Sequence, residues 1–370
     1  MKKSLLLIAC IAFFSHCKSG KAESSSPTVP AQGSFQAWTL TPFSKVDSLN
    51  PILRSSTTLA FDCPIQKKSV NWEEKNVFNP ACIVKDGKVF MLYRAQDNAG
   101  TSRIGLAVSD DGLHFSKTAK PVLFPDNDDM KKYEWPGGIE DPRIVQSINN
   151  QYIMTYTAYD GKTARLCLAT STDLIHWNKK GLVLNQAKYL DQWSKSGAII
   201  AKQTGDKVIA QKINGKYSMY FGDTDLFIAF SNDLIHWTPL EDENGKLVPV
   251  LHPRPFFHDS RLVESGPYAL ATARGIALIY NGMNAKIETD VSLPVGTYSA
   301  GQALFSPENP AKLVDRTATN FFRPDKPYEK IGEVNDVCFL EGMIHFNRKW
   351  FIYYGTADSK IAVAVCDKEL

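Results

Sequence analysis

Three short segments place carboxylates where strand-like apolar runs are interrupted. GGIEDPR contains Asp141, with two glycines that allow close backbone approach and a proline that stiffens the turn behind it. FGDTD contains Asp223, and HDSRLVESGP contains Glu264. Three carboxylates at one site suit cleavage of a glycosidic bond, because the leaving oxygen needs an acid and the incoming water needs a base. We therefore predict these three as catalytic; the alternatives are surface acids, or an ion pair with Arg143.

Other polar and aromatic residues have types that suit sugar binding. Arg94 ends an otherwise apolar strand, and Lys195 lies among small residues shortly after Trp193, which suits a hydrogen bond to a sugar hydroxyl. Trp135, Trp193 and Tyr298 offer stacking faces for a pyranose ring. The sequence has no nucleophile-elbow motif, phosphate-cradling glycine loop or His-rich metal cluster, so we expect neither a metal nor a cofactor.

A repeated pattern indicates the elements that position these residues. Apolar, aromatic stretches ending in small and polar residues recur at intervals of roughly 60 to 75 residues. A second element, of the form SDDGLHF, STDLIHW or SNDLIHW, follows three of them and has the composition of a turn. Its histidines, His114, His176 and His236, are expected to be structural. The aligned centres of the five stretches are Tyr93, Tyr156, Phe221, Tyr280 and Tyr354.

The short runs between these elements alternate in the manner of half-buried strands, so each unit supplies about four strands. A period of this length built only of strands is typical of propeller blades. We predict an all-β fold: a five-bladed β-propeller of four-stranded antiparallel blades around a central funnel. A two-sheet sandwich is the alternative, but a sandwich has no reason to repeat at a fixed interval. In a propeller, polar residues at equivalent points of successive blades meet in the funnel.

The N-terminal residues have the layout of a bacterial export signal. Lysines precede an apolar run that is too short to span a bilayer, and Cys17 follows it. We expect residues 1–17 to be a lipoprotein-type signal peptide with Cys17 as the lipidated residue, or an ordinary cleaved signal. Residues 18–35 are rich in Ser, Pro and Gly and are expected to be a flexible linker. Residues 36–370 form the predicted catalytic domain of a periplasmic or membrane-anchored protein.

Charge and cysteine content narrow the classes of partner. The formal net charge is +3, and no dense Lys/Arg run is present, so neither nucleic acid nor an anionic membrane is implied. The expected partner is an oligosaccharide or glycan, with membrane contact only through a lipid anchor; the oligomeric state is left open. Several cysteines lie in apolar strand-like runs and are interpreted as small buried side chains: Cys82, Cys167, Cys338 and Cys366.

Four motifs in order give the chain a resemblance to a known family. With GGIEDPR, the YRA triplet at 93–95, TAYD at 157–160 and YYGTAD at 353–358, the chain resembles family 130 of the glycoside hydrolases over residues 70–366. That family contains inverting β-mannoside phosphorylases and a smaller branch of β-1,2-mannosidases that use water, all five-bladed propellers. The resemblance implies that Asp141 delivers a proton through a substrate hydroxyl. It also implies that Asn79, Arg94 and Asp358 bind mannose in the −1 subsite.

The two branches of the family differ at the phosphate site. Where phosphorylases of the family carry a His-Arg pair and a Lys-containing segment, this sequence has Asp223 and Glu264. Acids in place of cations would repel a phosphate dianion, so we expect hydrolysis with inversion. One of the two activates water, and Asp141 or the other protonates the leaving oxygen. From the resemblance we expect glutamate in the hydrolytic branch at the position of Asp223, so this chain has a side chain one methylene shorter there. The alternatives are a phosphorylase releasing mannose 1-phosphate and a non-catalytic glycan-binding propeller.

Overall fold

The structure is a computed structural model that describes residues 36–367. The expected signal peptide (1–17) with Cys17 and the expected linker (18–35) lie outside the described residues. Strands make up nearly all of the regular structure, with only short helices between them, so the all-β class is confirmed. In the part of the chain from residue 36 to residue 367, no helix is long and apolar enough to cross a membrane.

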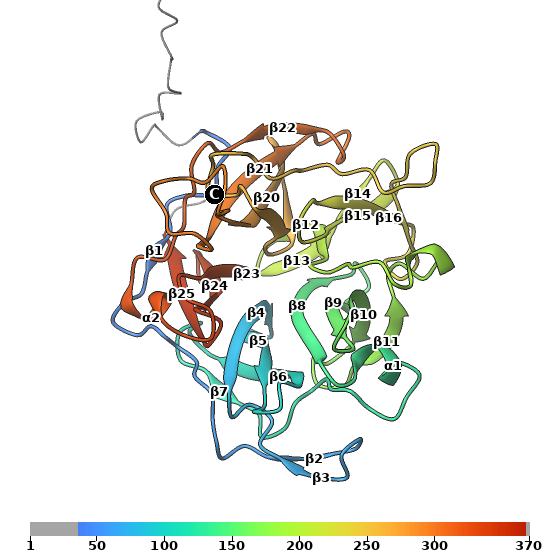
Figure 1. Cartoon of the computed structure of the whole chain (residues 1–370), viewed down its shortest axis with the longest axis vertical. Helices are drawn as coiled ribbons and strands as arrows, with labels where there is room; N and C mark the ends of the chain where they lie inside the picture. Colours follow the sequence, from blue (N-terminus) through green and yellow to red (C-terminus); the bar gives the residue numbers. More distant parts are fainter. Residues whose placement is uncertain (1–35, 368–370) are drawn as a thin grey trace, which may run out of the picture. The chain divides into compact units, whose positions relative to one another are not determined.

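Antiparallel runs of strands follow one another along the chain and lie around a common centre (Figure 1). The first run is β4-β5-β6-β7 and the second is β8-β9-β10-β11. β9 is buried at every position but the last, because a strand inside stacked sheets is covered on both faces. The bounds are β4 (Asn76–Lys85), β5 (Lys88–Gln96), β6 (Ser102–Ser109), β7 (Ser116–Lys117), β8 (Gly138–Gln146), β9 (Tyr152–Tyr159), β10 (Ala164–Ser171) and β11 (Asn178–Leu182).

The next two runs are less regular. In the third, β12 pairs with both β13 and β15, and β15 continues to β16 and β17. In the fourth, β18 and β19 both pair with β20, which continues to β21 and β22. The bounds are β12 (Ala198–Thr204), β13 (Lys207–Ala210), β14 (Lys212–Ile213), β15 (Lys216–Phe221), β16 (Phe227–Ser231), β17 (Trp237–Pro239), β18 (Leu262–Ser265), β19 (Ala269–Thr272), β20 (Gly275–Met283), β21 (Tyr298–Phe305) and β22 (Leu313–Arg316).

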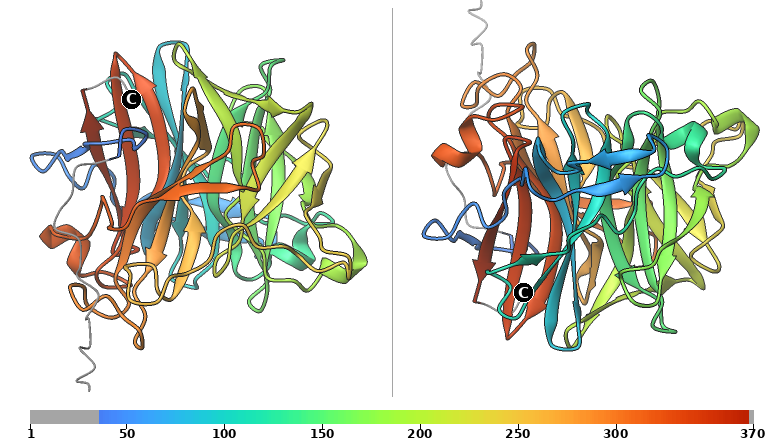
Figure 2. Two further views of the ribbon diagram at one scale, coloured as in Figure 1. Left: turned by 90° about the horizontal axis from the view of Figure 1, so that it is seen from above. Right: turned by 90° about the horizontal axis from the view of Figure 1, so that it is seen from below.

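The last run joins the two ends of the described chain. β1 pairs antiparallel with β25, with Ser44 opposite Val365, and extends the order β1-β25-β24-β23. The long strands of this run, drawn in red, lie side by side in both views of Figure 2. The remaining elements are β1 (Ser44–Lys45), β23 (Cys338–Phe346), β24 (Lys349–Thr356), β25 (Lys360–Cys366), a hairpin of β2 (Phe61–Cys63) and β3 (Lys68–Val70), α1 (Lys131–Glu134), α2 (Pro327–Lys330) and a 3₁₀ turn (Ala187–Tyr189).

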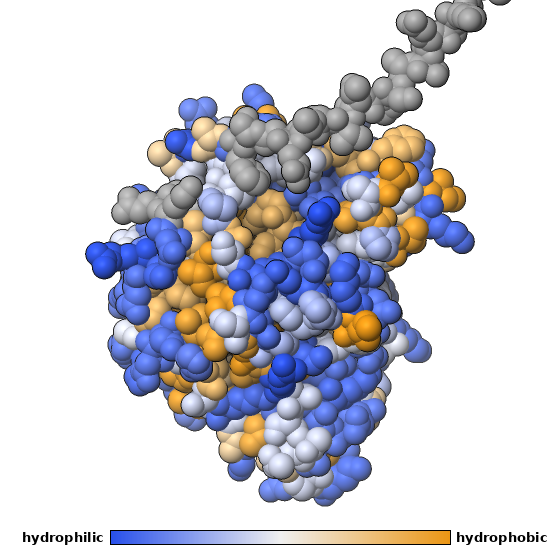
Figure 3. All heavy atoms as spheres, turned by 90° about the vertical axis from the view of Figure 1, so that its left-hand side faces the viewer, coloured by the Kyte–Doolittle hydropathy of each residue, from blue (hydrophilic) through white to orange (hydrophobic). Residues whose placement is uncertain are grey.

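Four strands from different runs meet near the centre. In Figure 1, β4, β8, β13 and β23 face one another there, and strands such as β7, β11 and β22 lie farther out. Parallel pairs join some neighbours: Ile200 of β12 lies opposite Ala269 of β19, and Ile209 of β13 lies opposite Gln146 of β8. Apolar clusters fill the space between runs, whereas one outer face is largely hydrophilic with smaller apolar patches (Figure 3).

Most of the aligned tyrosines share one buried arrangement. Tyr93 donates its hydroxyl hydrogen bond to Glu73 at 2.7 Å, and Lys117 lies 2.6 Å from the same carboxylate. Equivalent sets are Tyr156, Glu134 and Lys179, and Tyr354, Glu329 and Lys45. Tyr280 uses Asp259 with Arg254 and Arg316 instead.

The third repeat has Phe221 where the other repeats have a tyrosine. Phe221 packs in one apolar cluster with Leu166 of the preceding run, as Tyr156 packs with Leu92 of its own preceding run. Its neighbour Tyr220 faces the following run and donates its buried hydroxyl to the Pro310 carbonyl at 2.7 Å. The alignment of Phe221 with the tyrosines agrees with this packing, and a phenylalanine has no hydroxyl to bond a carboxylate.

The repeated turns are built as expected. In each, an aspartate accepts from two or more backbone N–H groups and bonds the ring of the histidine three residues later, as Asp173 does with His176 at 2.7 Å. His114 and His236 make the same contact with Asp111 and Asp233. The structural role of the three histidines is confirmed. The cysteines in strands β4, β10, β23 and β25 are buried, which agrees with their interpretation as small core side chains.

Candidate active site

Bulges on two central strands turn polar side chains toward each other. The register of β4 on β5 shifts at Asn79, and that of β8 on β9 shifts at Asp141. Both residues have left-handed backbone, with φ of 47° and 49°. Such φ values are costly for side-chain-bearing residues and persist where surrounding structure holds them. Asn79 Nδ2 donates to Asp141 Oδ1 at 2.9 Å, so the two bulges bring these predicted site residues together.

Arg94, near the end of β5, binds both acids of the GGIEDPR segment. Its Nη1 lies 3.1 Å from Asp141 Oδ1 and its Nη2 lies 2.5 Å from Glu140 Oε1. Burial by itself would raise the pKa of Asp141, but Arg94, Lys195 and the Asn79 amide stabilise the anion and hold that pKa at about 2. Asp141 is therefore ionised at neutral pH. Glu140 binds the same guanidinium as Asp141. Its pKa is nevertheless raised, because the effect of burial exceeds that of Arg94.

Lys195 lies between two of the predicted catalytic acids. Its Nζ is 3.1 Å from Glu264 Oε1 and 4.0 Å from Asp141 Oδ2. Ser196, which has φ of 59°, donates its hydroxyl to the same oxygen of Glu264. Burial opposes the charge of Lys195, but Glu264, Asp141 and Asp223 raise its pKa. Glu264 is 2% exposed, and burial raises its pKa although Lys195 opposes that shift.

Asp358 and Tyr298 complete the inner part of the site. Asp358 follows β24 with φ of 48°, and burial raises its pKa to about 6 against the opposing charge of Arg94. Tyr298 begins β21, and burial followed by the charge of Glu264 raises its pKa. These mutual electrostatic effects put both side chains in the same group as Arg94, Lys195 and Glu264. The predicted residues of four separate runs thus converge on one site.

Asp223 and Trp193 lie at the outer edge of this group. The Trp193 indole donates to Asp223 Oδ2 at 2.6 Å, and its side chain packs edge-on against Tyr159 at 6.3 Å. Trp193 is 45% exposed and Asp223 is partly buried. Asp223 contributes to the raised pKa values of Lys195 and Tyr298, which places its charge near the site. Its hydrogen-bond partners among the described residues are Trp193 and Thr224.

The arrangement has the components of acid–base chemistry on a polar ligand. It contains buried carboxyls with raised pKa values, among them Glu264, an ionised carboxylate at Asp141, and cations already paired with acids. Between residues 36 and 367, no group of three or more metal-ligating side chains is suitably placed to hold a metal ion. These side chains can transfer protons and form hydrogen bonds with a polar ligand.

Comparison with known proteins assigns the family. The sequence profile described as β-1,4-mannooligosaccharide phosphorylase matches residues 44–370. The chain belongs to glycoside hydrolase family 130. A family relative, the 1,2-β-oligomannan phosphorylase of Thermoanaerobacter sp. (strain X514), is 32% identical over 81% of this chain and 93% of the relative.

Solved structures of similar proteins agree with this family-130 assignment. A glycosyl hydrolase from Bacteroides ovatus is 41% identical, with a TM-score of 0.88 over 90% of this chain and 96% of that one. A second solved structure is described by the statement that the GH130 family of mannoside phosphorylases contains glycoside hydrolases that target β-1,2 mannosidic linkages in Candida mannan. It is also 41% identical, with a TM-score of 0.88 over 90% of this chain and 95% of that chain.

The sequence interpretation missed one buried acid of this family-130 chain. The register of β23 on β24 shifts at Glu341, as it does at Asn79 and Asp141 on their strands. Glu341 is 2% exposed, and neither carboxyl oxygen has a hydrogen-bond partner among the described residues. Burial raises its pKa well above the usual value. A signal was present: a polar residue followed by Pro or Gly occurs at Asn79, Asp141, Ser196 and Glu341.

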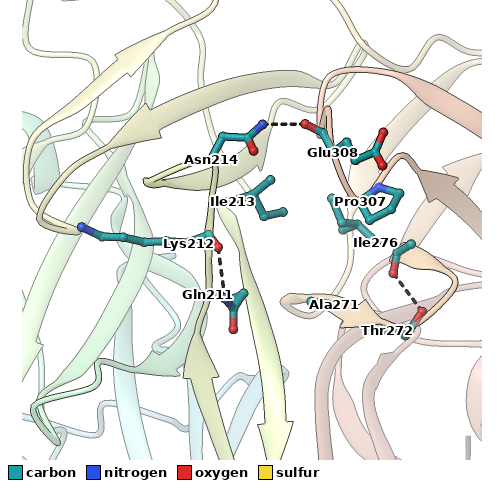
Figure 4. Close-up of a pocket in the computed structure, with 10 residues that line it drawn as sticks. Gln211, Lys212, Ile213, Asn214, Ala271, Thr272, Ile276, Pro307 and Glu308 are labelled. Atoms are coloured by element: carbon teal, nitrogen blue, oxygen red, sulfur yellow. Dashed lines mark hydrogen bonds between the residues drawn. The ribbon is translucent and has the colours of Figure 1, made fainter.

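A separate pocket lies away from these residues. It has a volume of about 350 Å³ and is lined by the β14 turn, the β19–β20 turn and residues 307–308. Figure 4 shows Asn214 donating to the Glu308 carbonyl across its top. None of the predicted site residues lines it, and its charged side chains are Lys212 and Glu308. It therefore has no part in the candidate active site.

Proposed function

We propose that this family-130 protein hydrolyses β-mannosidic linkages, with β-1,2-linked mannosides as substrates, by a single displacement with inversion. The observation that carries the proposal is the buried carboxyl of Glu264, held by Lys195 and Ser196 beside Asp141. A carboxyl with a raised pKa is suited to accept a proton from water near neutral pH. Glu264 is therefore the proposed base, in preference to the less buried Asp223.

The −1 mannose would contact the polar side chains of the inner site. Asn79 and Arg94 bind Asp141, and the charges of Arg94 and Asp141 act on Asp358. Sugar hydroxyls are both donors and acceptors, so they can bond to the amide, the guanidinium and the carboxylates at once. Tyr298 and Trp193 would offer aromatic faces farther out.

In the proposed reaction, water attacks the anomeric carbon from the face opposite the leaving group. Glu264 accepts a proton from that water while the glycosidic C–O bond breaks. Asp141 delivers a proton to the leaving oxygen through a substrate hydroxyl, as the family resemblance implies. Because Arg94 and Lys195 keep the pKa of Asp141 low, Asp141 must first take up this proton from solvent, as the bound sugar displaces these cations from its carboxylate. The products are mannose with inverted configuration and the shortened glycan.

The charge distribution favours water over phosphate as the nucleophile. Arg94 is paired with Glu140 and Asp141, and Lys195 is paired with Glu264. With Asp223 and Asp358 nearby, the site carries more acids than free cations, which repels a phosphate dianion. The higher identity to structures described as glycosyl hydrolases, 41% against 32% for a phosphorylase, gives further support.

A phosphorylase that releases mannose 1-phosphate is the second candidate. The family profile and the Thermoanaerobacter relative carry phosphorylase descriptions, which is the observation in its favour. A glycan-binding protein without turnover is the third. Product analysis on β-1,2- and β-1,4-mannobiose, each with and without inorganic phosphate, separates them. Mannose formed at the same rate without phosphate supports hydrolysis; mannose 1-phosphate formed only with phosphate excludes it, and binding without turnover indicates the third candidate.

We also propose that the antiparallel runs are the blades of a five-bladed β-propeller. The run orders β4–β7, β8–β11, β12–β17, β18–β22 and β23–β25 with β1 support this count. Pairing of β1 with β25 would join the last blade to the start of the chain. A crystal structure tests the proposal by the number of four-stranded units around the central axis.

Export and lipidation at Cys17 remain proposals, as do the signal peptide at 1–17 and the linker at 18–35. They rest on the Lys-apolar-Cys order of the sequence. Expression of the full chain and of Cys17→Ala in a Gram-negative host, followed by fractionation and lipid labelling, tests them. Label in the parent protein and none in C17A is expected, whereas an unprocessed protein in the cytoplasm contradicts export.

A further inference from the structure

Arg143 of β8 reaches across the centre of the molecule to another run. Its Nε donates to the Gly266 carbonyl at 2.8 Å, and its Nη2 donates to the Ser265 carbonyl at 2.6 Å. Its Nη1 donates back to the Asp141 carbonyl at 3.2 Å. One guanidinium therefore joins the backbone of Asp141 to the backbone that directly follows Glu264.

The bonds of Arg143 go to main-chain oxygens rather than to substrate-facing groups. Arg143 is 2% exposed, so it does not contact a sugar. Its nearest carboxylate is Glu341, with Nη1 3.6 Å from Oε1, beyond hydrogen-bond distance. Arg94, not Arg143, binds the side chains of Glu140 and Asp141. The sequence left open an ion pair between these acids and Arg143, but the structure forms that ion pair with Arg94.

We propose that Arg143 is a positioning residue that sets the separation between the Asp141 and Glu264 carboxylates. The inference rests on the proposed hydrolysis. Inversion requires carboxyl groups roughly 6.5–9.5 Å apart, so that water fits between the base and the anomeric carbon. The two acids come from β8 and β18, which do not pair with each other. A backbone link between these strands is therefore a direct way to control that distance.

An arginine is suited to this role for geometric reasons. The planar guanidinium presents five N–H donors in a fixed fork, whereas a lysine ammonium is a flexible point charge. Here three donors meet three carbonyls, on β8, on β18 and on the residue that follows β18. Glu341 packs on another side of the fork, within 3.6 Å of Nη1, and restricts its movement. Arg143→Lys keeps the positive charge but removes the planar set of N–H donors. The variant therefore distinguishes the effect of the charge from the effect of the guanidinium geometry.

The experiment compares Arg143→Lys with Arg103→Lys as a matched control. Arg103 is also fully buried and binds Asp97 at 2.8 Å, outside the candidate site. For each variant we would measure thermal stability, kcat and KM on β-1,2-mannobiose, the dissociation constant for mannose, and a crystal structure. Misplacement by about 1 Å can cost about a hundredfold in rate. We expect R143K to lose about that factor in kcat, with mannose affinity within about threefold of the parent.

The crystal structure supplies the decisive measurement. We expect the Asp141-to-Glu264 carboxylate distance to change in R143K and to stay unchanged in R103K, whose kcat should match the parent even if its stability falls. A kcat of R143K near the parent value overturns the proposal. So does a loss of kcat with both carboxylates in their original positions.

Two further measurements keep the proposal testable if R143K does not fold or if the parent protein does not hydrolyse mannosides. If R143K does not fold, Glu341→Ala removes the side chain that restricts the fork, and a loss of kcat of about tenfold with a shifted guanidinium is expected. Unchanged kcat and unchanged geometry in E341A then overturn the proposal. If the parent protein shows no mannoside hydrolysis, the proposed function fails first. The carboxylate distances in parent and variant crystals still test the positioning role by itself.

Discussion

Lys195 Nζ lies 3.1 Å from Oε1 of Glu264. The same ammonium is 4.0 Å from Oδ2 of Asp141, so one cation stands between the proposed base and the proposed proton donor. Burial raises the pKa of Glu264, and Lys195 opposes that shift. The balance between these two effects sets the pH at which the base becomes active.

Replacement of Lys195 should move the acid limb of the pH profile. The base acts as a carboxylate, so activity is lost as pH falls through the pKa of Glu264. Lys195→Met removes a charge that lowers this pKa, so the acid limb of kcat/KM should move to higher pH. Lys188→Met, which removes an exposed ammonium paired with Glu241, should leave the limb in place. A shift of K195M to lower pH, or no shift, would contradict the placement of Lys195.

Glu264→Gln should abolish base catalysis and keep the site folded. The amide has nearly the same size and can still accept from Ser196, but it cannot take a proton from water. General-base catalysis contributes about 10²–10⁴-fold, so kcat should fall by about that factor. Steady-state kinetics on β-1,2-mannobiose measure it, with Glu308→Gln in the separate pocket as the control. If E264Q retains parental kcat, Glu264 is not the base.

Trp193→Phe should show how strongly the indole N–H holds Asp223. The variant keeps an aromatic ring and removes the donor that lies 2.6 Å from Asp223 Oδ2. A hydrogen bond to a charged group contributes about 1.5–3 kcal/mol when well shielded, and less at this exposed position, so a fall in kcat/KM of about tenfold is expected. Trp177→Phe is the control, because its indole donates to the Leu174 carbonyl in a repeated turn. Equal effects of both variants would exclude a specific role for Trp193.

The buried Tyr–Glu–Lys sets should matter for stability. Glu134→Ala leaves the Tyr156 hydroxyl and the nearly buried Lys179 ammonium without their shared partner. Removal of one member of a buried ion pair costs about 3–5 kcal/mol in the free energy of unfolding. Asp128→Ala, which removes a more exposed partner of the same lysine, should cost under about 1 kcal/mol. Urea denaturation of both variants measures the difference, and similar losses would count against a special role for Glu134.

Much of the candidate site was predictable because polar residues interrupt apolar strands. Asp141, Arg94, Lys195 and Glu264 were identified in this way, and the structure brings them into one contact group. The all-β class followed from the repeat of apolar stretches, whose burial on both faces is visible in strands such as β9. Asp223 was also identified, but its contact with Trp193 rather than with the inner group was not.

The amino-acid sequence by itself determined which residue types recur and where strands are interrupted, because apolar periodicity and turn chemistry are local. Only the tertiary structure decided which strands face each other at the centre. The left-handed backbone of Asn79 and Asp141, the link from Arg143 to the Glu264 strand, and the burial of Glu341 all depend on neighbours distant in the chain. The cost of a buried charge or a positive φ is set by those neighbours, which no local pattern specifies.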